Sequence, residues 1–118
     1  MIEPEPTRAT ACNCTVCRRY GALWAYGRLG QSVRISGTGN GYVRADSSDL
    51  EFVHCSNCGC LTHYVATAPS DDGKTLAAVN LRMVDPEDVA EIPLRHFDGF
   101  ETWQAVEGHA AVVKDLWF

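Results

Sequence analysis

The stretch CNCTVCRRYGALW, residues 12–24, holds the feature from which we infer both the architecture and the chemistry of this chain. Three cysteines fall within six residues, two arginines follow directly, and an apolar segment comes next. A second group, Cys55, Cys58 and Cys60, lies in the segment HCSNCGC. Each group contains a C-x-x-C pair, a spacing at which a tight turn directs two sulfur atoms to one tetrahedral ion.

Three explanations compete for these thiols, namely a disulfide framework, a metal site and reactive cysteines. Six cysteines in 118 residues lie below the roughly 8–10% typical of disulfide scaffolds. The opening residues MIEPEPTRATA lack the basic start and apolar run of a secretory signal, so we expect a cytoplasmic protein with reduced thiols. Metal binding is therefore favoured. Thiolates select soft ions, of which Zn²⁺ is the natural candidate.

Two arrangements of a zinc site remain open from the spacing. In one, Cys14, Cys17, Cys55 and Cys58 form a closed four-sulfur site of the ribbon type, which is structural and leaves one cysteine of each group unused. In the other, Cys12, Cys14 and Cys17 bind the ion and leave its fourth position free. An open position distinguishes catalytic from structural zinc.

The rest of the chain predicts a mostly β domain of antiparallel sheets. Short segments rich in β-branched and aromatic residues alternate with turn signals such as Asn40-Gly41, which is typical of successive strands. Asp85 and Pro86 suit the start of a short helix. Candidate strands cover 22–27, 32–36, 42–45, 50–54, 61–67, 76–83 and 111–118, and candidate helical turns cover 14–19, 85–92 and 99–106.

Length and charge exclude several classes. A chain of 118 residues predicts one domain. A net charge of −5 does not suit nucleic-acid binding, which depends on neutralising phosphates. The longest apolar segments fall short of the roughly 18 residues that a membrane helix requires, so we expect neither a nucleic-acid nor a membrane partner.

Four blocks in order, CNCTVCRRYGALWAY, HCSNCGC, AVNLRMVDP and HFDGFETW, resemble the glutathione-dependent formaldehyde-activating (GFA) family, which is related to centromere protein V. The resemblance runs from Cys12 to Trp103. It implies a single GFA-like zinc-binding domain over residues 1–118, with a β-tent fold of twisted antiparallel sheets and a flexible or irregular segment at 1–11.

The resemblance also implies the metal ligands. The family's catalytic zinc maps onto Cys12, Cys14 and Cys17, and its structural zinc maps onto Cys55 and Cys58, with Cys60 as a possible substitute ligand. The family's upstream C-x-C-G hairpin, which supplies two further structural ligands, has no counterpart in the eleven residues before Cys12. We therefore expect at most one tightly held zinc ion per chain.

The implied activity is of the carbon–sulfur lyase type, as in S-(hydroxymethyl)glutathione synthase. A small thiol such as glutathione adds reversibly to formaldehyde or a related aldehyde, and Cys12, Cys14 and Cys17 carry the catalysis. Arg18 and Arg19 can hold the carboxylates of such a thiol, or they are a solvated pair at a helix end. The alternative function is a non-catalytic zinc-stabilised binding or structural module with the four-sulfur site.

Histidines and aromatic residues complete the list of candidates. His63 and His96 are candidate proton shuttles, and His54 either binds metal or is a satisfied, partly buried side chain. The aromatic side chains are predicted to belong to the core rather than to a substrate site; they are Trp24, Tyr26, Tyr64 and Trp103.

Overall fold

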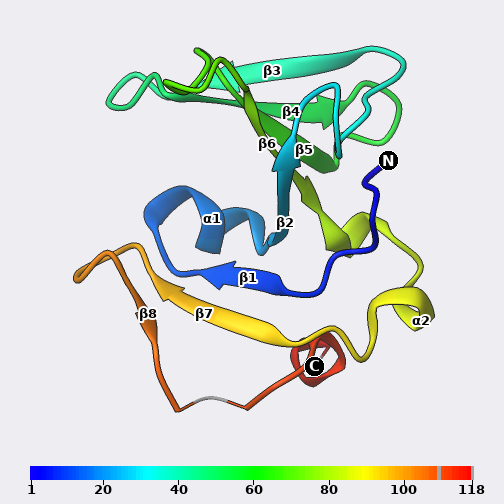
Figure 1. Cartoon of the computed structure of the whole chain (residues 1–118), viewed down its shortest axis with the longest axis vertical. Helices are drawn as coiled ribbons and strands as arrows, with labels where there is room; N and C mark the ends of the chain where they lie inside the picture. The colour runs from blue at the N-terminus through cyan, green and yellow to red at the C-terminus, as the bar shows by residue number, and fades with distance from the viewer. Residues whose placement is uncertain (109, 118) are drawn as a thin grey trace. The chain divides into compact units, whose positions relative to one another are not determined.

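The computed structural model describes residues 1–108 and 110–117, and Figure 1 labels its elements. The described residues are mostly β, with eight strands, two short α-helices and two 3₁₀ turns, which confirms the predicted class. They group into two compact units. Unit 1 combines Met1–Glu5 with Tyr26–Val79, and unit 2 combines Pro6–Ala25 with Asn80–Phe118. Each unit is therefore assembled from two separate segments of chain.

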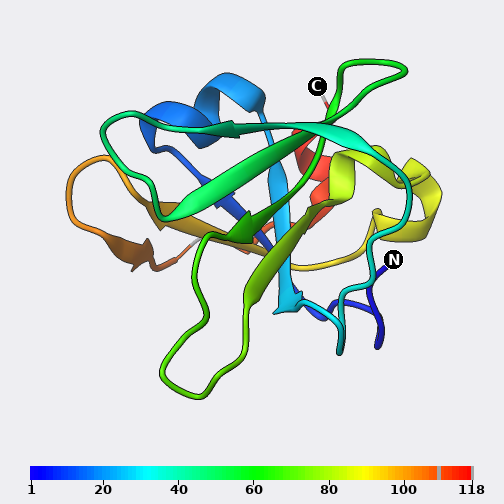
Figure 2. The same cartoon turned by 90° about the horizontal axis from the view of Figure 1, so that it is seen from above.

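Unit 1 is an antiparallel meander. Its strands pair in the order in which they occur along the chain, and Figure 2 allows the successive hairpins to be followed from cyan to green. The ladder shifts register between Val53 and His54, which is the signature of a β-bulge. The strands are β3 (Gly39–Val43), β4 (Leu50–Cys55), β5 (Leu61–Ala66) and β6 (Leu76–Asn80), the last residue of β6 belonging to unit 2.

The core of unit 1 lies along β4 and β5. Phe52 and Tyr64 are register partners, both are buried, and their rings meet edge to face with centroids 5.6 Å apart. Strand β3 is exposed throughout and lies so close to β4 that a Cβ on Gly39 would be 2.7 Å from the His54 carbonyl oxygen. Tyr26 is 43% exposed, so the prediction that it belongs to the core was wrong.

Unit 2 is organised around β1 (Ala9–Cys12), which pairs on both sides. One neighbour is the antiparallel strand β2 (Leu23–Arg28), which enters unit 1 after Ala25. The other is β7 (Leu94–Asp98), which runs parallel to β1 and pairs antiparallel with β8 (Gln104–Val106). β1 and β7 lie side by side in Figure 1.

Strand β1 departs from two expectations. It begins at Ala9, inside the segment expected to be irregular. It also pairs parallel with β7, whereas the prediction was all antiparallel. A parallel pair needs a long connection, and here most of the chain separates the two strands. Local sequence patterns do not reveal such a pairing.

The short helices follow local capping signals. Helix α1 (Thr15–Tyr20) occupies the predicted helical turn, and α2 (Pro86–Val89) has Pro86 in its first turn as predicted. The predicted strand 76–83 ends at Asn80, where the 3₁₀ turn η1 (Leu81–Met83) begins. The predicted helical turn at 99–106 is instead a loop that leads into β8.

Two predicted strands were wrong. Residues 32–36 make only bridges through Val33. Residues 111–117 form a bridge and the 3₁₀ turn η2 (Val113–Leu116), because Asp115 Oδ2 accepts a hydrogen bond from Val112 N at 2.9 Å and such local bonds compete with a strand ladder. Residue 118, the last of that predicted strand, lies outside the described residues, as does His109. Within the described part of the chain, no helix is long and apolar enough to cross a membrane.

Candidate metal centre

The three sulfur atoms of Cys12, Cys14 and Cys17 lie within 4.8 Å of one another in unit 2. They converge because β1 ends at Cys12 and α1 begins at Thr15, so the chain turns sharply between the first and last cysteine. A tetrahedral zinc ion with Zn–S bonds of about 2.3 Å holds its sulfurs about 3.8 Å apart, which small side-chain rotations can reach from this arrangement. The donor set therefore fits a soft divalent ion.

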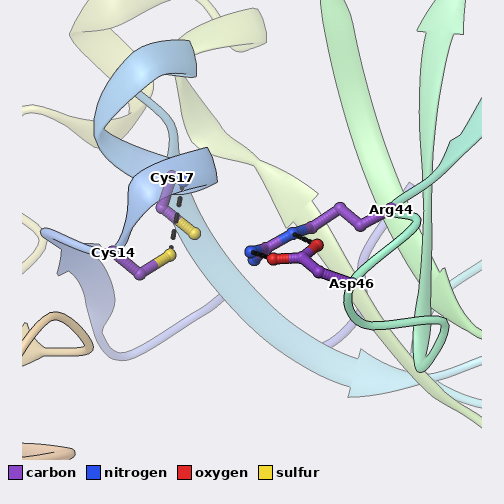
Figure 3. A network of polar contacts seen from close by, with 4 residues as sticks. All are labelled: Cys14, Cys17, Arg44 and Asp46. Atoms are coloured by element: carbon purple, nitrogen blue, oxygen red, sulfur yellow. Dashed lines mark hydrogen bonds and ion pairs between the residues drawn. The ribbon is translucent and has the colours of Figure 1, made fainter.

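Cys14 caps helix α1. Its sulfur accepts a hydrogen bond from Cys17 N at 3.4 Å, drawn as a dashed line in Figure 3, where Ser or Asp would usually supply an oxygen. Cys12 Sγ accepts from Cys14 N at 3.5 Å. The helix ends at Gly21, whose φ of 64° and bond to the Cys17 carbonyl form a left-handed cap. The same short helix thus fixes two of the three sulfurs.

Cys17 is held by a buried tryptophan. Its sulfur accepts a hydrogen bond from Trp24 Nε1 at 3.3 Å, and Trp24 is 1% exposed on β2. A buried indole N–H requires an acceptor, and here a sulfur atom supplies one. The prediction that Trp24 belongs to the core is confirmed, and the same ring orients a candidate ligand.

The thiols of the cluster share protons. The hydrogen bond between Cys12 and Cys17 lowers the pKa of Cys12 to about 6, although burial acts against this, and amides of Cys14 and Gly99 assist. The same bond, together with burial, raises the pKa of Cys17. Without a metal ion, Cys12 is therefore the thiol of the cluster whose pKa is lowered towards neutral pH.

The loop between β7 and β8, residues 99–103, lies directly against the cluster. A Cβ atom on Gly99 would be 2.7 Å from Cys12 Sγ and 2.9 Å from Cys14 Cβ. Both separations are below any normal contact, so only glycine fits this position without displacement of the cysteines.

Asp98 and Asn13 hold that loop in place. The Asp98 carboxylate accepts bonds from the backbone of Glu101 at 3.0 Å and of Thr102 at 3.0 Å, and from Asn13 Nδ2 at 3.0 Å. These donors hold the pKa of Asp98 below its usual range. Asn13 Oδ1 accepts in turn from Phe100 N at 3.1 Å. Sequence reasoning missed Asn13, Asp98 and Gly99 as site residues. An Asp-Gly dipeptide is a general turn signal, but it does not reveal a contact with the cysteines.

The second cysteine group forms a knuckle between β4 and β5 in unit 1. Cys55 N donates to the Cys60 carbonyl at 2.9 Å, Gly59 N donates to the Cys55 carbonyl at 2.8 Å, and Gly59 has a φ of 75°, as its place in a knuckle predicts. Backbone bonds from Cys58 and Asn57 lower the pKa of Cys55. Cys58 and Cys60 are exposed. Among the described residues, only the first group brings three ligand atoms within 4.8 Å of one another.

The predicted arginine pair lies in the last turn of α1. Arg18 and Arg19 are exposed, and neither has an ion-pair partner within the part of the chain that the structure describes. By contrast Arg44, also drawn in Figure 3, belongs to unit 1 and binds both carboxylate oxygens of Asp46 at 2.9 and 2.7 Å.

The candidate histidines are divided between the units. His63 and His54 lie on unit 1 strands, where His63 Nδ1 is 2.8 Å from Thr62 Oγ1 and His54 Nδ1 is 3.3 Å from the Asn40 carbonyl oxygen. Burial lowers the pKa of His63. His96 lies on β7 in unit 2, in register with Ala11. The proposed shuttle role of His63 and His96 stays a prediction.

Comparisons with known proteins give one similar structure. No family model matches the chain, and no curated protein matches it. The crystal structure of a Rhodobacter sphaeroides protein, determined as a structural-genomics target, resembles the chain with a TM-score of 0.54 and 26% sequence identity. The match covers 80% of this chain and 86% of that chain, so the similarity extends over most of both molecules.

Proposed function

We propose that this chain is a GFA-like zinc protein whose Cys12, Cys14 and Cys17 site performs carbon–sulfur lyase chemistry. In this reaction a small thiol such as glutathione adds to formaldehyde or a related aldehyde, and the adduct can revert. The observation that carries the proposal is the convergence of three sulfur atoms with no fourth His, Cys, Asp or Glu ligand joining them among the described residues. Such a donor set suits an ion with one exchangeable position.

The surroundings of the sulfurs support a charged, metal-binding form. Zinc, when bound there, supplies a position at which an incoming thiol is held as its thiolate. The chain supplies N–H donors to the ligand sulfurs from Cys14, Cys17 and the Trp24 indole. Bonds of this kind orient ligands and stabilise their negative charge.

The negative charge of a zinc ion bound by several thiolates suggests a role for Arg18 and Arg19. Three thiolates on a divalent ion leave one negative charge, and a fourth thiolate leaves two. Arg18 and Arg19, exposed on the same short helix as Cys17, offset this charge. They can also bind the carboxylates of an anionic thiol, since guanidinium groups match carboxylates in geometry.

The overall reaction needs no further cofactor. A bond forms between the thiol sulfur and the carbonyl carbon, and the carbonyl oxygen gains a proton to replace the one that the thiol loses. Neither partner is oxidised or reduced. The chain's contribution is to keep the sulfur deprotonated and to position it beside the aldehyde.

The test is the rate of adduct formation between glutathione and formaldehyde, followed by NMR exchange with and without the zinc-loaded chain. We expect acceleration above the spontaneous rate. Cys12→Ser should remove this acceleration, and the control Cys60→Ser should retain it. A zinc-loaded wild-type chain that leaves the spontaneous rate unchanged would refute the proposal.

The non-catalytic module is the outcome that such a failure would favour. Its four-sulfur site would use Cys14, Cys17, Cys55 and Cys58. Cobalt substitution separates the two, because thiolate-to-cobalt absorption reports the number of sulfur ligands. An absorption spectrum of four sulfur ligands that disappears in Cys55→Ser would indicate the structural site. A spectrum of three sulfur ligands that disappears in Cys12→Ser would indicate the open site.

A further inference from the structure

Two large aromatic side chains are exposed on the loop that contacts the cysteine cluster. Phe100 is 68% exposed and Trp103 is 71% exposed. The prediction that Trp103 belongs to the core was therefore wrong. Exposed aromatic side chains next to a candidate reactive centre are suited to contact a ligand.

The backbone of Trp103 is in an unfavourable conformation. Its φ is 57°, and it is the one non-glycine residue with positive φ in the described chain. A bulky side chain rarely adopts this region because its Cβ crowds the backbone. Strain that persists at a site is more often associated with function than with stability.

Trp103 stands next to the cluster with only glycine between them. Its Cζ3 atom is 3.5 Å from the position that a Cβ on Gly99 would take, and that position is 2.7 Å from Cys12 Sγ. The indole also meets the Phe97 ring edge to face at 5.3 Å and 81°. Phe97 is the register partner of Cys12 in the parallel ladder, so one side of the indole is fixed by β7, the strand that pairs with β1 and its last residue, Cys12.

The loop is organised before any ligand arrives. The Asp98 carboxylate binds the backbone of Glu101 and Thr102 and the hydroxyl of Thr102 at 2.9 Å. Asn13, which lies between Cys12 and Cys14, ties the same carboxylate to the metal-binding segment. A surface fixed in this way loses little conformational entropy on binding.

We propose that Trp103 determines thiol specificity. Its exposed indole forms a wall against which the organic body of a thiol packs while the sulfur occupies the cysteine site. At the same site that accepts a glutathione-like thiol in the proposed function, a thiol with a flat or apolar group next to the sulfur then binds more tightly than an uncharged small hydrophilic thiol. This inference rests on the proposed function, because it requires a thiol at the Cys12, Cys14 and Cys17 site.

The test compares two uncharged thiols, benzyl mercaptan and 2-mercaptoethanol, so that the arginines do not contribute to the difference. Their dissociation constants are measured by calorimetry with the zinc-loaded full chain. Wild type should bind benzyl mercaptan more tightly, and Trp103→Gly should reduce this preference about three- to tenfold, the range expected for one aromatic contact. Glycine is chosen because it adopts positive φ freely.

Two further variants separate recognition from structure. Trp103→Phe keeps an aromatic ring and should keep most of the preference. Trp117→Ala removes another exposed tryptophan, which directly follows η2, and should leave the preference for benzyl mercaptan unchanged. Zinc content and melting temperature are measured for each variant, since a general loss of structure would lower both.

The outcomes separate the two proposals. If both thiols bind and Trp103→Gly leaves the ratio of their dissociation constants at the wild-type value, the wall is refuted and the proposed function stands. If neither thiol binds the zinc-loaded wild type, and cobalt absorption does not respond to thiol, then both proposals fail.

Discussion

Gly99→Ala tests most directly whether the loop after β7 shapes the metal centre. The added methyl group would lie 2.7 Å from Cys12 Sγ and 2.9 Å from Cys14 Cβ. Ordinary contacts lie at about 3.5–4.0 Å, so the Cys12 sulfur or the loop must retreat by roughly 1 Å. Metal–ligand distances tolerate only about ±0.2 Å, so zinc binding should resist that displacement.

The size of the effect follows from overpacking. Inserting a methyl group into a filled space typically costs about 1–3 kcal/mol, and every 1.4 kcal/mol is about tenfold in affinity. If the strain falls on the bound state, zinc affinity should weaken by about 5- to 150-fold. The Gly99 amide remains in the variant, so the loss would be steric rather than the loss of a hydrogen bond.

The assay is competition for zinc with a chromophoric chelator. Gly41→Ala is the matched control, because its methyl group would meet the terminal Glu51 carboxylate at 1.8 Å, a flexible side chain of unit 1 that can move away. We expect wild-type zinc affinity in that control. Wild-type affinity in Gly99→Ala as well would show that the loop does not confine the cysteines.

Three further predictions concern stoichiometry, protonation and substrate charge. The purified chain should hold at most one tightly bound zinc, and Cys55→Ser should leave its affinity unchanged; two tightly bound ions measured by elemental analysis would contradict this. In the metal-free chain, thiolate ultraviolet absorbance should show one group with a midpoint near pH 6, from the lowered pKa of Cys12. Because the pKa of Cys12 is lower in the folded than in the unfolded chain, ionisation of this thiol adds to the free energy of unfolding at high pH. That contribution is lost as the pH falls through about 6. Removing its partner by Cys17→Ala should return the midpoint toward the ordinary thiol value, and an unchanged titration would disprove the shared proton. Arg18→Ala with Arg19→Ala should weaken glutathione binding about three- to tenfold at constant zinc content, and an unaltered calorimetric affinity would leave them as solvated charges.

The ligand cluster was predictable because it is local. Cys12, Cys14 and Cys17 lie on one strand end and one helical turn, and their spacing alone limits how far apart the sulfurs can be. The helical turn α1, which Cys14 caps and which contains Cys17, was predictable for the same reason, as was α2 from its Asp-Pro start. In each case the interactions that decide the structure join residues only a few positions apart.

The surroundings of the cluster were not predictable from such patterns. Asn13 and Asp98 are 85 residues apart in sequence, and their contact depends on the parallel pairing of β1 with β7. Tryptophan is usually buried, yet the turn that Asp98 organises directs Trp103 to the surface. The segment from Val112 onward has the composition of a strand, but the Asp115 side chain caps its amide and closes a 3₁₀ turn instead.

The same long separation sets an order of events during synthesis of the chain. The three cysteines leave the ribosome before the loop that contacts them, since Asn13 and Asp98 are 85 positions apart in sequence. A zinc ion that reaches the nascent segment would meet the thiols before Gly99 and Trp103 are present. Contacts of such high sequence separation also form slowly, so the cysteines can bind zinc before the loop packs against them. The loop would then pack against a site that already holds its ion.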